Sequence, residues 1–383
     1  MWEKKQTYSL LEMIPPKENL RPFISMEHIL SNIWSVYSSL EGAKNLKKKW
    51  WVGRRLYFVT FEIVSHGPNP RFFIRCNEDH RDSIRVAFYS QYPTMEFREI
   101  KENSPENYTK TMDWNGPDGK WNFYGMDEVL GNNDMYPIKT YTQFFETKPE
   151  NIKDEKRVDP INTLLEGLKA LREDEQIWLQ LRITPVSPND SDFLKRGKKL
   201  INKLAFRQEK KGKSILKDVL FEKNKDSKDD KEFIPPEMKL TNREREIIQA
   251  VEEKIGKSVF QTNIRCLYFG RNKDFRSGRK SLAEEYFHSF AAPDLNFFKK
   301  FSKTKTKVWH FFVKRRFYMR KRKIFRQYVL RETPLFPRKG GTFILNTEEV
   351  ATIFHPPVET GSSSHLVQSV QAKKGEAPGD LPV

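Results

Sequence analysis

Residues 176–184 read Gln-Ile-Trp-Leu-Gln-Leu-Arg-Ile-Thr, the clearest secondary-structure pattern in the chain. Ile177, Leu179, Leu181 and Ile183 stand at every second position, which places them on one face of a β-strand. The tryptophan, glutamine and arginine between them then lie on the other face. The pattern predicts a strand with two different faces.

Helical patterns lie on both sides of this strand. Asp159-Pro160 is typical of a helix start, because aspartate caps the first turn and proline suits its first position. Further along, Thr241 and Glu244 have the spacing of a capping box, in which each side chain bonds to the backbone N–H of the other residue. We expect residues 136–298 to form an α/β unit, with further strands at 138–145 and 260–269.

The stretch 190–240 interrupts this unit. It holds a basic helical stretch and then a mixed-charge run without apolar residues, 223–231. A run of this composition has nothing to bury in a core. We expect a mobile insertion in an otherwise repeated architecture.

Residues 1–103 follow the order strand, helix, strand, strand, helix, strand. Ser25 is the expected cap of the first helix, because apolar residues follow it at helical spacing: Met26, Ile29, Leu30, Ile33, Trp34 and Tyr37. This order of elements is that of the ferredoxin-like split βαβ unit. The elements are predicted at 7–14, 26–37, 56–64, 71–75, 79–90 and 95–100.

Three further segments complete the expected organisation. Residues 104–135 are predicted to be an irregular connection, because Gly, Pro, Asn and Asp cluster there. Residues 332–357 are predicted to be a short strand and a helix that Asn346 and Glu349 cap, and residues 358–383 a flexible tail. The fold class is therefore α/β (α+β): a ferredoxin-like unit, a second unit with an insertion, and a basic helical segment.

The amino-acid composition indicates a folded, basic protein without a predicted membrane span or disulfide framework. The 383 residues include 69 Lys and Arg against 51 Asp and Glu, a net charge of +18, and the isoelectric point is about 9.6. The 29 Phe, 13 Tyr and 8 Trp argue against wholesale disorder. No apolar run approaches the ~20 residues of a membrane span, and the first residues do not have the pattern of a signal peptide. The two cysteines are too few for a disulfide framework, so a reducing compartment fits best.

Most of the net positive charge of +18 lies in one segment. Residues 296–331 contain 14 Lys or Arg and no Asp or Glu. Between Lys299 and Lys323, aromatic residues interrupt the cations. Cations neutralise phosphates and aromatic faces stack on bases, so the segment 299–331 is the candidate contact with a polyanion. The candidate binding residues are Lys314, Arg315, Arg316, Arg320, Lys321, Arg322, Lys323 and Arg326.

Two other interpretations of this segment stay open. Trp309, Val313 and Phe317 fall at helical spacing, so the segment could be a helix whose aromatic side packs on the body of the protein. Arg316 and Arg320 lie close to that stripe, which weakens this interpretation. The cations could also contact an anionic membrane surface, where each contributes about 1 kcal/mol.

A nucleotide-binding phosphate loop is not expected. The motif needs Gly, four spacers, Gly-Lys and Ser or Thr, so that backbone N–H groups and a lysine hold the phosphates. Gly212-Lys213-Ser214 and Gly256-Lys257-Ser258 supply its second half, but Arg207 and Val251 stand where the first glycine belongs. We therefore predict that the protein does not hydrolyse ATP and needs no cofactor.

Other catalytic and metal sites are weakly supported. The seven histidines are scattered, and Cys76 and Cys266 lie in predicted strands, where a buried structural role is expected. Asp118, Glu146 and Lys148 imitate the order of a metal-dependent nuclease, but Asp118 lies in a Pro-Asp-Gly turn. No metal site is predicted.

Several short blocks resemble the amino-terminal region of conjugative-transfer, type IV secretion ATPases of the HerA-like class. They run over residues 8–356, nearly the whole chain. The most specific are Tyr136-Pro137-Ile138-Lys139-Thr140-Tyr141, Asp159-Pro160-Ile161, Leu295-Asn296-Phe297 and the run from Phe343 to Pro356.

The resemblance implies an α/β region that precedes a RecA-like motor coupling ATP hydrolysis to DNA or protein transfer. The chain departs from that pattern, because it has no phosphate loop and ends at Val383 without a motor. The resemblance then implies that the motor is a separate polypeptide, or that this is an isolated amino-terminal component.

The leading hypothesis is a non-enzymatic component of a type IV secretion-like transfer machine. It would dock on a motor ATPase in the cytoplasm, at the inner face of the cell membrane. Contact with DNA or with an anionic membrane surface stays open, and so does the formation of oligomers. The alternative is a stand-alone nucleic-acid-binding protein that uses residues 299–331, and the third hypothesis is a metal-dependent nuclease.

Overall fold

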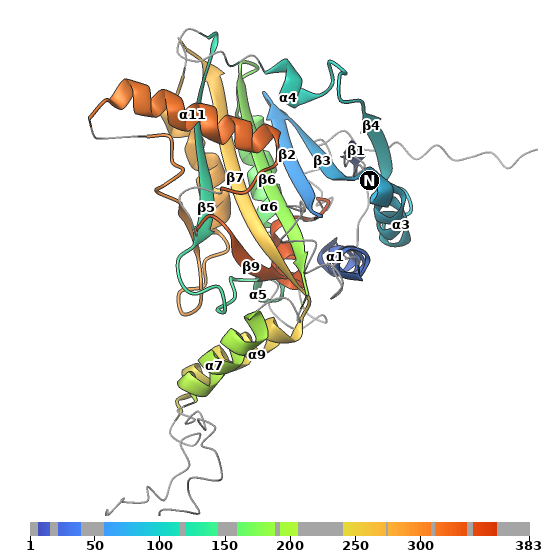
Figure 1. The fold of residues 1–383 in the computed structure, drawn as a ribbon, viewed down its shortest axis with the longest axis vertical. Coiled ribbons are helices and arrows are strands. Elements are labelled where there is room, and N and C mark those ends of the chain that lie inside the picture. Colours follow the sequence, from blue (N-terminus) through green and yellow to red (C-terminus); the bar gives the residue numbers. More distant parts are fainter. Residues whose placement is uncertain are drawn as a thin grey trace, which may run out of the picture.

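The described part of the chain is a mixed α/β structure built on one large antiparallel sheet (Figure 1). In this computed structural model, nine strands and ten α-helices are described. The described residues are 7–15, 22–39, 57–112, 114, 119–144, 159–187, 192–205, 240–272, 275–307, 311–334 and 340–357. The predicted mixed-charge run 223–231 and the tail 358–383 lie outside them.

The first half of the chain supplies four neighbouring strands and two covering helices. In the sheet the strands follow the order β4-β1-β3-β2, and every pairing is antiparallel. The order of elements predicted for this half is confirmed, but the first helix begins at Pro22, so Ser25 is not its cap. The elements are β1 (Tyr8–Ile14), α1 (Pro22–Ser39), β2 (Val59–His66), β3 (Asn69–Asn77), α3 (Arg81–Gln91) and β4 (Glu96–Ile100), with a 3₁₀ turn at Glu78–His80.

The second half repeats this connectivity. Strand β5, helix α6, strands β6 and β7, helix α10 and strand β8 follow one another in the chain, and the strands lie in the order β8-β5-β7-β6. Their bounds are β5 (Trp121–Leu130), α6 (Pro160–Lys169), β6 (Glu175–Val186), β7 (Val259–Arg271), α10 (Ser281–His288) and β8 (Phe298–Lys300). The remaining elements are α4 (Tyr108–Thr111), α5 (Tyr141–Phe144), α7 (Phe193–Leu204), α9 (Asn242–Gly256), α11 (Val313–Val329), β9 (Phe343–Asn346) and α12 (Thr347–Ile353), with a 3₁₀ turn at Ser277–Lys280.

The two halves share one continuous sheet. Strand β2 pairs with β6 along eight residues, with Phe61 opposite Leu181 and Ile63 opposite Leu179. Strand β6, which contains residues 176–184, therefore lies at the junction of the two halves. Helices α7 and α9 and the insertion lie in the connection between β6 and β7, and both helices stand below the sheet in Figure 1.

Two sequence predictions in the second half are wrong. Residues 121–130, assigned to an irregular connection, form β5, which pairs with β7 and β8. Turn residues lie on both sides of this stretch, and its apolar residues do not alternate, because both faces of β5 are buried. The strand predicted at 138–145 is absent, because residues 141–144 form the short helix α5 in the described structure.

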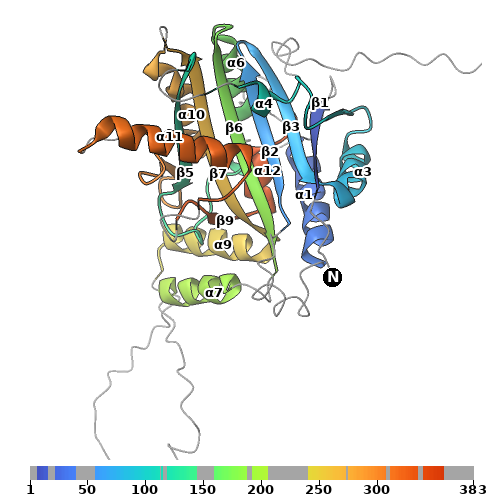
Figure 2. The same ribbon diagram turned by 45° about the horizontal axis from the view of Figure 1, so that its top comes forward.

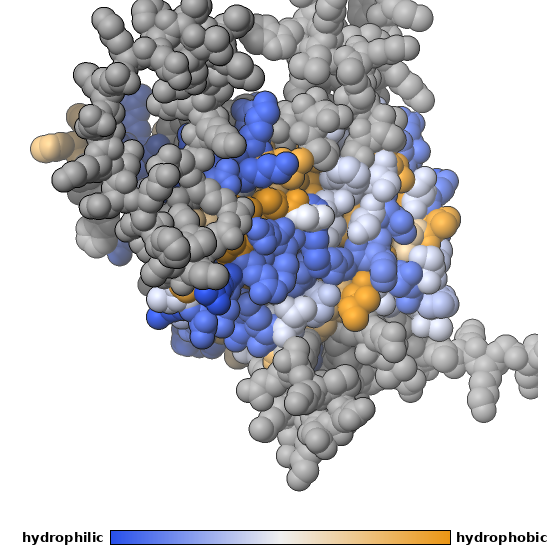
Figure 3. Space-filling view, turned by 90° about the horizontal axis from the view of Figure 1, so that it is seen from below, coloured by the Kyte–Doolittle hydropathy of each residue, from blue (hydrophilic) through white to orange (hydrophobic). Residues whose placement is uncertain are grey.

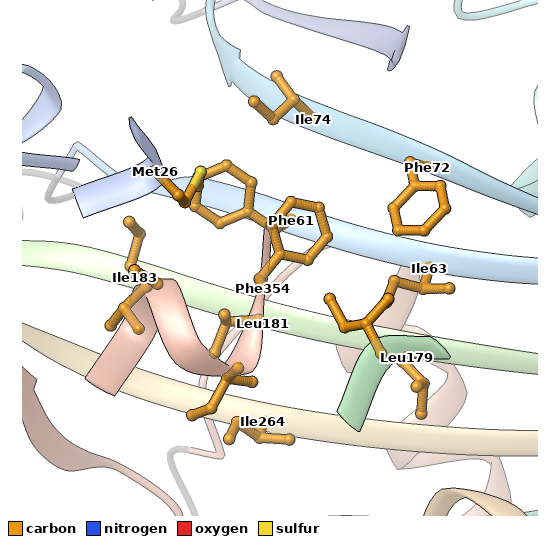
Figure 4. Close-up of a cluster of buried hydrophobic side chains, with 14 of the residues drawn as sticks. Met26, Phe61, Ile63, Phe72, Ile74, Leu179, Leu181, Ile183, Ile264 and Phe354 are labelled. Carbon is orange, nitrogen blue, oxygen red and sulfur yellow. The ribbon is translucent and has the colours of Figure 1, made fainter. Parts of the chain in front are cut away.

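The two faces of the sheet are covered unequally, by a thick layer of helices on one side (the thick side) and by a thin layer on the other (the thin side). On the thick side, α1, α3, α6, α10 and α12 cover a core into which β2 and β6 send alternate residues, including Phe61, Ile63, Leu179 and Leu181 (Figure 4). On the thin side, α4 and α11 cover a smaller cluster that contains Trp178 (Figures 1 and 2). The two predicted faces of 176–184 are thus confirmed.

Candidate nucleic-acid interface

Helix α11 crosses the thin side of the sheet (Figures 1 and 2). Its residues Ile324 and Tyr328 belong to the buried cluster under it, and the Tyr328 ring lies 5.4 Å from that of Trp178 on β6. On β5, Gly125 lets the helix approach closely, because an added Cβ would lie 3.2 Å from Ile324. Burial of one face therefore holds a very basic helix against the body of the protein.

A buried ion pair fixes the carboxyl end of α11. Arg331 contacts Glu62 of β2 at 2.9 Å and 3.1 Å through two nitrogens, and neither side chain is more than 5% exposed. Tyr108 and Gln180 also donate hydrogen bonds to Glu62. Burial alone would raise the pKa of Glu62, but the charge and hydrogen bonds of Arg331 outweigh it and lower this pKa. The pair is a charged anchor in an otherwise aromatic cluster.

The backbone at the same point is unusual. Arg331 has a φ of 54°, a left-handed conformation that normally favours glycine at the end of a helix. Its N–H donates to Tyr328 and that of Glu332 donates to Gln327, which closes the last turn of α11. Sequence analysis missed this anchor, because nothing in the spacing of Glu62 and Arg331 brings them together.

Most of the predicted binding cations lie on the free face of α11. Arg315, Arg322 and Arg326 share one stripe, since they stand seven and four residues apart, and all three are exposed. Lys314, Arg316 and Lys323 are exposed beside them, and Arg320 is half-buried with its guanidinium donating to the Lys305 carbonyl at 2.8 Å. The helix itself carries no acidic residue. Its outer surface is a strip of positive charge.

Lys321 is an exception, and its predicted role in binding is wrong. Only 4% of it is exposed, and its ammonium lies over the rings of Phe317 and Phe123 at 4.0 Å and 5.3 Å and donates to Asn122. Burial lowers its pKa to about 8. It lies on the same face as Ile324 and Tyr328, so it cannot reach a phosphate outside the protein.

The amino-terminal end of α11 carries exposed aromatic residues. Phe311 is 88% exposed and Phe312 82% exposed, and one residue, Val313, separates them from the cations of the first turn. Phe312 is in the left-handed region at φ 56° and has no side-chain acceptor for the first-turn N–H groups. In both ribbon views this end of the helix extends past β5 (Figures 1 and 2). Trp309 lies outside the described residues.

The described residues of the predicted basic segment that precede α11 are not helical. Residues 298–300 form β8, and the following turns run along β5, where Thr304 and Thr306 accept hydrogen bonds from backbone N–H groups of β5. Within the described part of 299–331, the basic α-helix spans residues 313–329. The packing interpretation is thus right for one face of α11, and the polyanion interpretation concerns the other face.

The residues considered for catalysis do not assemble a site in the described structure. Lys257 contacts Glu27 and Glu348 at 2.9 Å and 2.7 Å, and Val251 is buried in α9. The second candidate loop at 212–214, and Asp118, Glu146 and Lys148 of the nuclease hypothesis, lie outside the described residues. Across the described ranges, no three His, Cys, Asp or Glu side chains gather as metal ligands. Cys76 and Cys266 are buried, as predicted.

The blocks that carry the family resemblance meet inside the second half. His355 lies 3.0 Å from Asp159 at the start of α6, and both are buried. Glu349 of α12 accepts from the Ile138 N–H and the Lys254 ammonium, both at 3.0 Å. These contacts tie the last described strand and helix to the body of the protein.

Comparison with known families gives one match. The model of a domain of unknown function (DUF8128) matches residues 40–363. A search of curated proteins found no match. Among the helices that the structure describes, none is long and apolar enough to cross a membrane.

Proposed function

The chain belongs to the DUF8128 family, and from this premise we propose that it is a non-catalytic component of a DNA-transfer machine that contacts nucleic acid through the free face of α11. The observation that carries the proposal is the strip of exposed cations on this helix. Phosphates of nucleic acid are its natural counterpart, since neutralising them releases condensed counterions.

The position of α11 supports a docking role. The helix is held by a buried apolar face and by the Arg331–Glu62 anchor, so its cations are presented on a rigid element. No acidic side chain on the helix competes for them. A ligand therefore meets cations whose spacing is already set, which lowers the entropy cost of binding.

The place in a transfer machine rests on the sequence resemblance. Its blocks supply the contacts of Asp159 with His355 and of Glu349 with Ile138, which lie where the described chain ends at residue 357. We propose that these two contacts hold this part of the protein in the position where it docks on a motor ATPase. Docking in the cytoplasm at the inner face of the membrane is part of the same proposal.

We also propose that residues 8–100 are a ferredoxin-like unit. The strand order β4-β1-β3-β2 supports this, together with α1 and α3, which contact each other on one face. The order β8-β5-β7-β6 extends the same proposal to the second half.

The test is the salt dependence of binding to a 30-base-pair duplex. If about five cations meet phosphates, log K should fall against log salt with a slope of roughly −4 to −5. The variant Arg315→Gln/Arg322→Gln/Arg326→Gln should reduce the steepness of this slope by about 2.7, that is about 0.9 for each lost contact. Binding should depend little on base sequence, because phosphate contacts position a protein without specifying bases.

Helix α7 offers a matched control. Its Lys198, Lys199 and Lys203 are exposed, and it lies far from α11 in both ribbon views. Figure 3 shows the molecule from below Figure 1, where hydrophilic residues cover most of the described surface. The variant Lys198→Gln/Lys199→Gln/Lys203→Gln removes the same charge. Equal losses in the two variants would mean that net charge alone binds DNA, and the proposed site would be wrong.

A further inference from the structure

We propose that Phe311 and Phe312 are a stacking platform for unpaired bases, so that the α11 surface selects single-stranded over double-stranded nucleic acid. The inference rests on the proposed function and names its ligand more closely. Two large aromatic side chains stand 88% and 82% exposed at the end of the cation strip. Exposed apolar side chains are stabilised when a partner removes them from water, and an aromatic ring can be covered by a base that stacks on it.

The neighbouring charges suit a strand whose bases are free. Lys314, Arg315 and Arg316 follow the two phenylalanines after one residue, Val313, and are exposed. The N–H groups of the first turn of α11 add partial positive charge, and the phenyl ring of Phe312 offers them no acceptor. A phosphate near this end therefore places its own base within reach of the rings. Bases in a duplex are already stacked on one another, so they gain nothing from the rings.

A membrane fits the same residues less well. A helix that lies on a bilayer inserts an apolar face. The apolar face of α11, with Ile324 and Tyr328, is already buried against the sheet, and cations occupy the free face. Apart from the short Phe311–Val313 end, the exposed large apolar side chains here are the single residues Met319 and Leu330, which form no continuous apolar face, while the cations run the length of the helix. An extended polyanion matches this arrangement better than a surface touched by one end.

The test compares Phe311→Ala/Phe312→Ala with the parent protein on three probes: a 20-nucleotide mixed-sequence single strand, its duplex, and vesicles with 30% anionic lipid. We expect single-strand affinity to fall by about 5- to 150-fold for each base that loses its stacking partner. Duplex affinity should stay within about twofold, because phosphate contacts are unchanged. The unfolding midpoint should also be unchanged, since both side chains are exposed.

A second variant gives a direct signal. Phe311→Trp keeps an aromatic face, so it should retain single-strand affinity, and single strands should quench the fluorescence of the new tryptophan more than duplex does. Equal effects of the double alanine variant on single strand and duplex, or a loss confined to vesicles, would overturn the stacking platform. If the parent binds neither nucleic acid while the protein is folded, the proposed function fails as well.

Discussion

Arg331 combines a buried ion pair with a left-handed backbone conformation on the thin side of the sheet. Its guanidinium pairs with Glu62 while its backbone stays in the left-handed region. Glycine would adopt this backbone without strain, so the side-chain contact must compensate for it. The charge on Arg331 therefore serves structure, although it belongs by sequence to the same basic segment as the exposed cations of α11.

We predict that Arg331→Met lowers the free energy of unfolding by about 3–5 kcal/mol, because it leaves the carboxylate of Glu62 buried without its partner. Urea unfolding measures the change. Glu62→Gln combined with Arg331→Met should cost less than the sum of the two single variants, since the pair is coupled. The control Arg326→Met removes an exposed cation and should change stability by less than about 0.5 kcal/mol. Similar losses for Arg326 and Arg331 would contradict the anchor.

Lys321 predicts a pH dependence with a defined sign. Its pKa is about 8 in the folded protein against 10.5 as the ordinary value. Between these values the unfolded chain binds the proton and the folded protein does not, so stability should rise with pH. The rise should approach ~1.4 kcal/mol per pH unit for this one group. The comparison is urea unfolding of the parent and of Lys321→Met from pH 7 to 10.

The variant should remove this rise, and the control Lys314→Met, whose side chain is exposed, should retain it. Parallel curves for the parent and Lys321→Met would show that the ammonium keeps its ordinary pKa and reaches solvent. Lys321 would then return to the set of binding residues.

Helix α11 packs closely against the sheet at one glycine, Gly125 of β5. A Cβ on Gly125 would lie 2.5 Å from the Leu267 side chain of β7 and 3.2 Å from Ile324 of α11, so Gly125→Ala should displace the Leu267 side chain and disturb the packing of the helix on the sheet. We expect a loss of about 1–3 kcal/mol in unfolding free energy, the usual cost of overpacking. Gly256→Ala is the control, because nothing lies within 4 Å of its Cβ and alanine favours helix. That variant should be neutral or up to about 1 kcal/mol more stable.

Binding of nucleic acid should also depend on the packing of α11 at Gly125. If Gly125→Ala displaces α11, the Arg331–Glu62 anchor is strained too, and the cation strip loses its rigid presentation. Salt-dependent DNA affinity should fall in this variant while Gly256→Ala leaves it unchanged. A destabilised variant with full affinity would mean that the helix binds as an independent element.

At the scale of the whole molecule, the two halves depend on each other. Strand β2 pairs with β6, α6 of the second half contacts β3, and α1 of the first half contacts β6. Val59 and Phe61 are almost fully buried at this junction. Separation of the halves would expose a long apolar strand edge, which is prone to aggregation.

We therefore predict one cooperative unfolding transition for the chain, seen together by circular dichroism and tryptophan fluorescence. The isolated fragment 1–112 should not fold cooperatively as a monomer, because β2 loses its neighbour. A fragment with its own transition near that of the full chain would show that the first half is an independent domain. Two separate transitions in the full chain would lead to the same conclusion.

The sequence by itself determined the local elements. The alternation in 176–184, the Asp159 cap and the capping boxes of α9 and α12 are confirmed, because each depends on residues close in the chain. The insertion between β6 and β7 and the basic character of α11 were also evident. Local pattern was misleading where turn residues surround a strand, as at β5, and where a short stretch rich in threonine and aromatic residues forms the helix α5.

Only the tertiary structure decided how these elements meet. Pairing of β2 with β6 joins two halves that the sequence analysis divided, since strand neighbours far apart in the chain leave no local signal. The same holds for the cations of one helix: packing buries Lys321, exposes Arg315, Arg322 and Arg326, and places Arg331 on Glu62. Charge can be counted from sequence, but its availability to a ligand depends on which face of the helix the sheet covers.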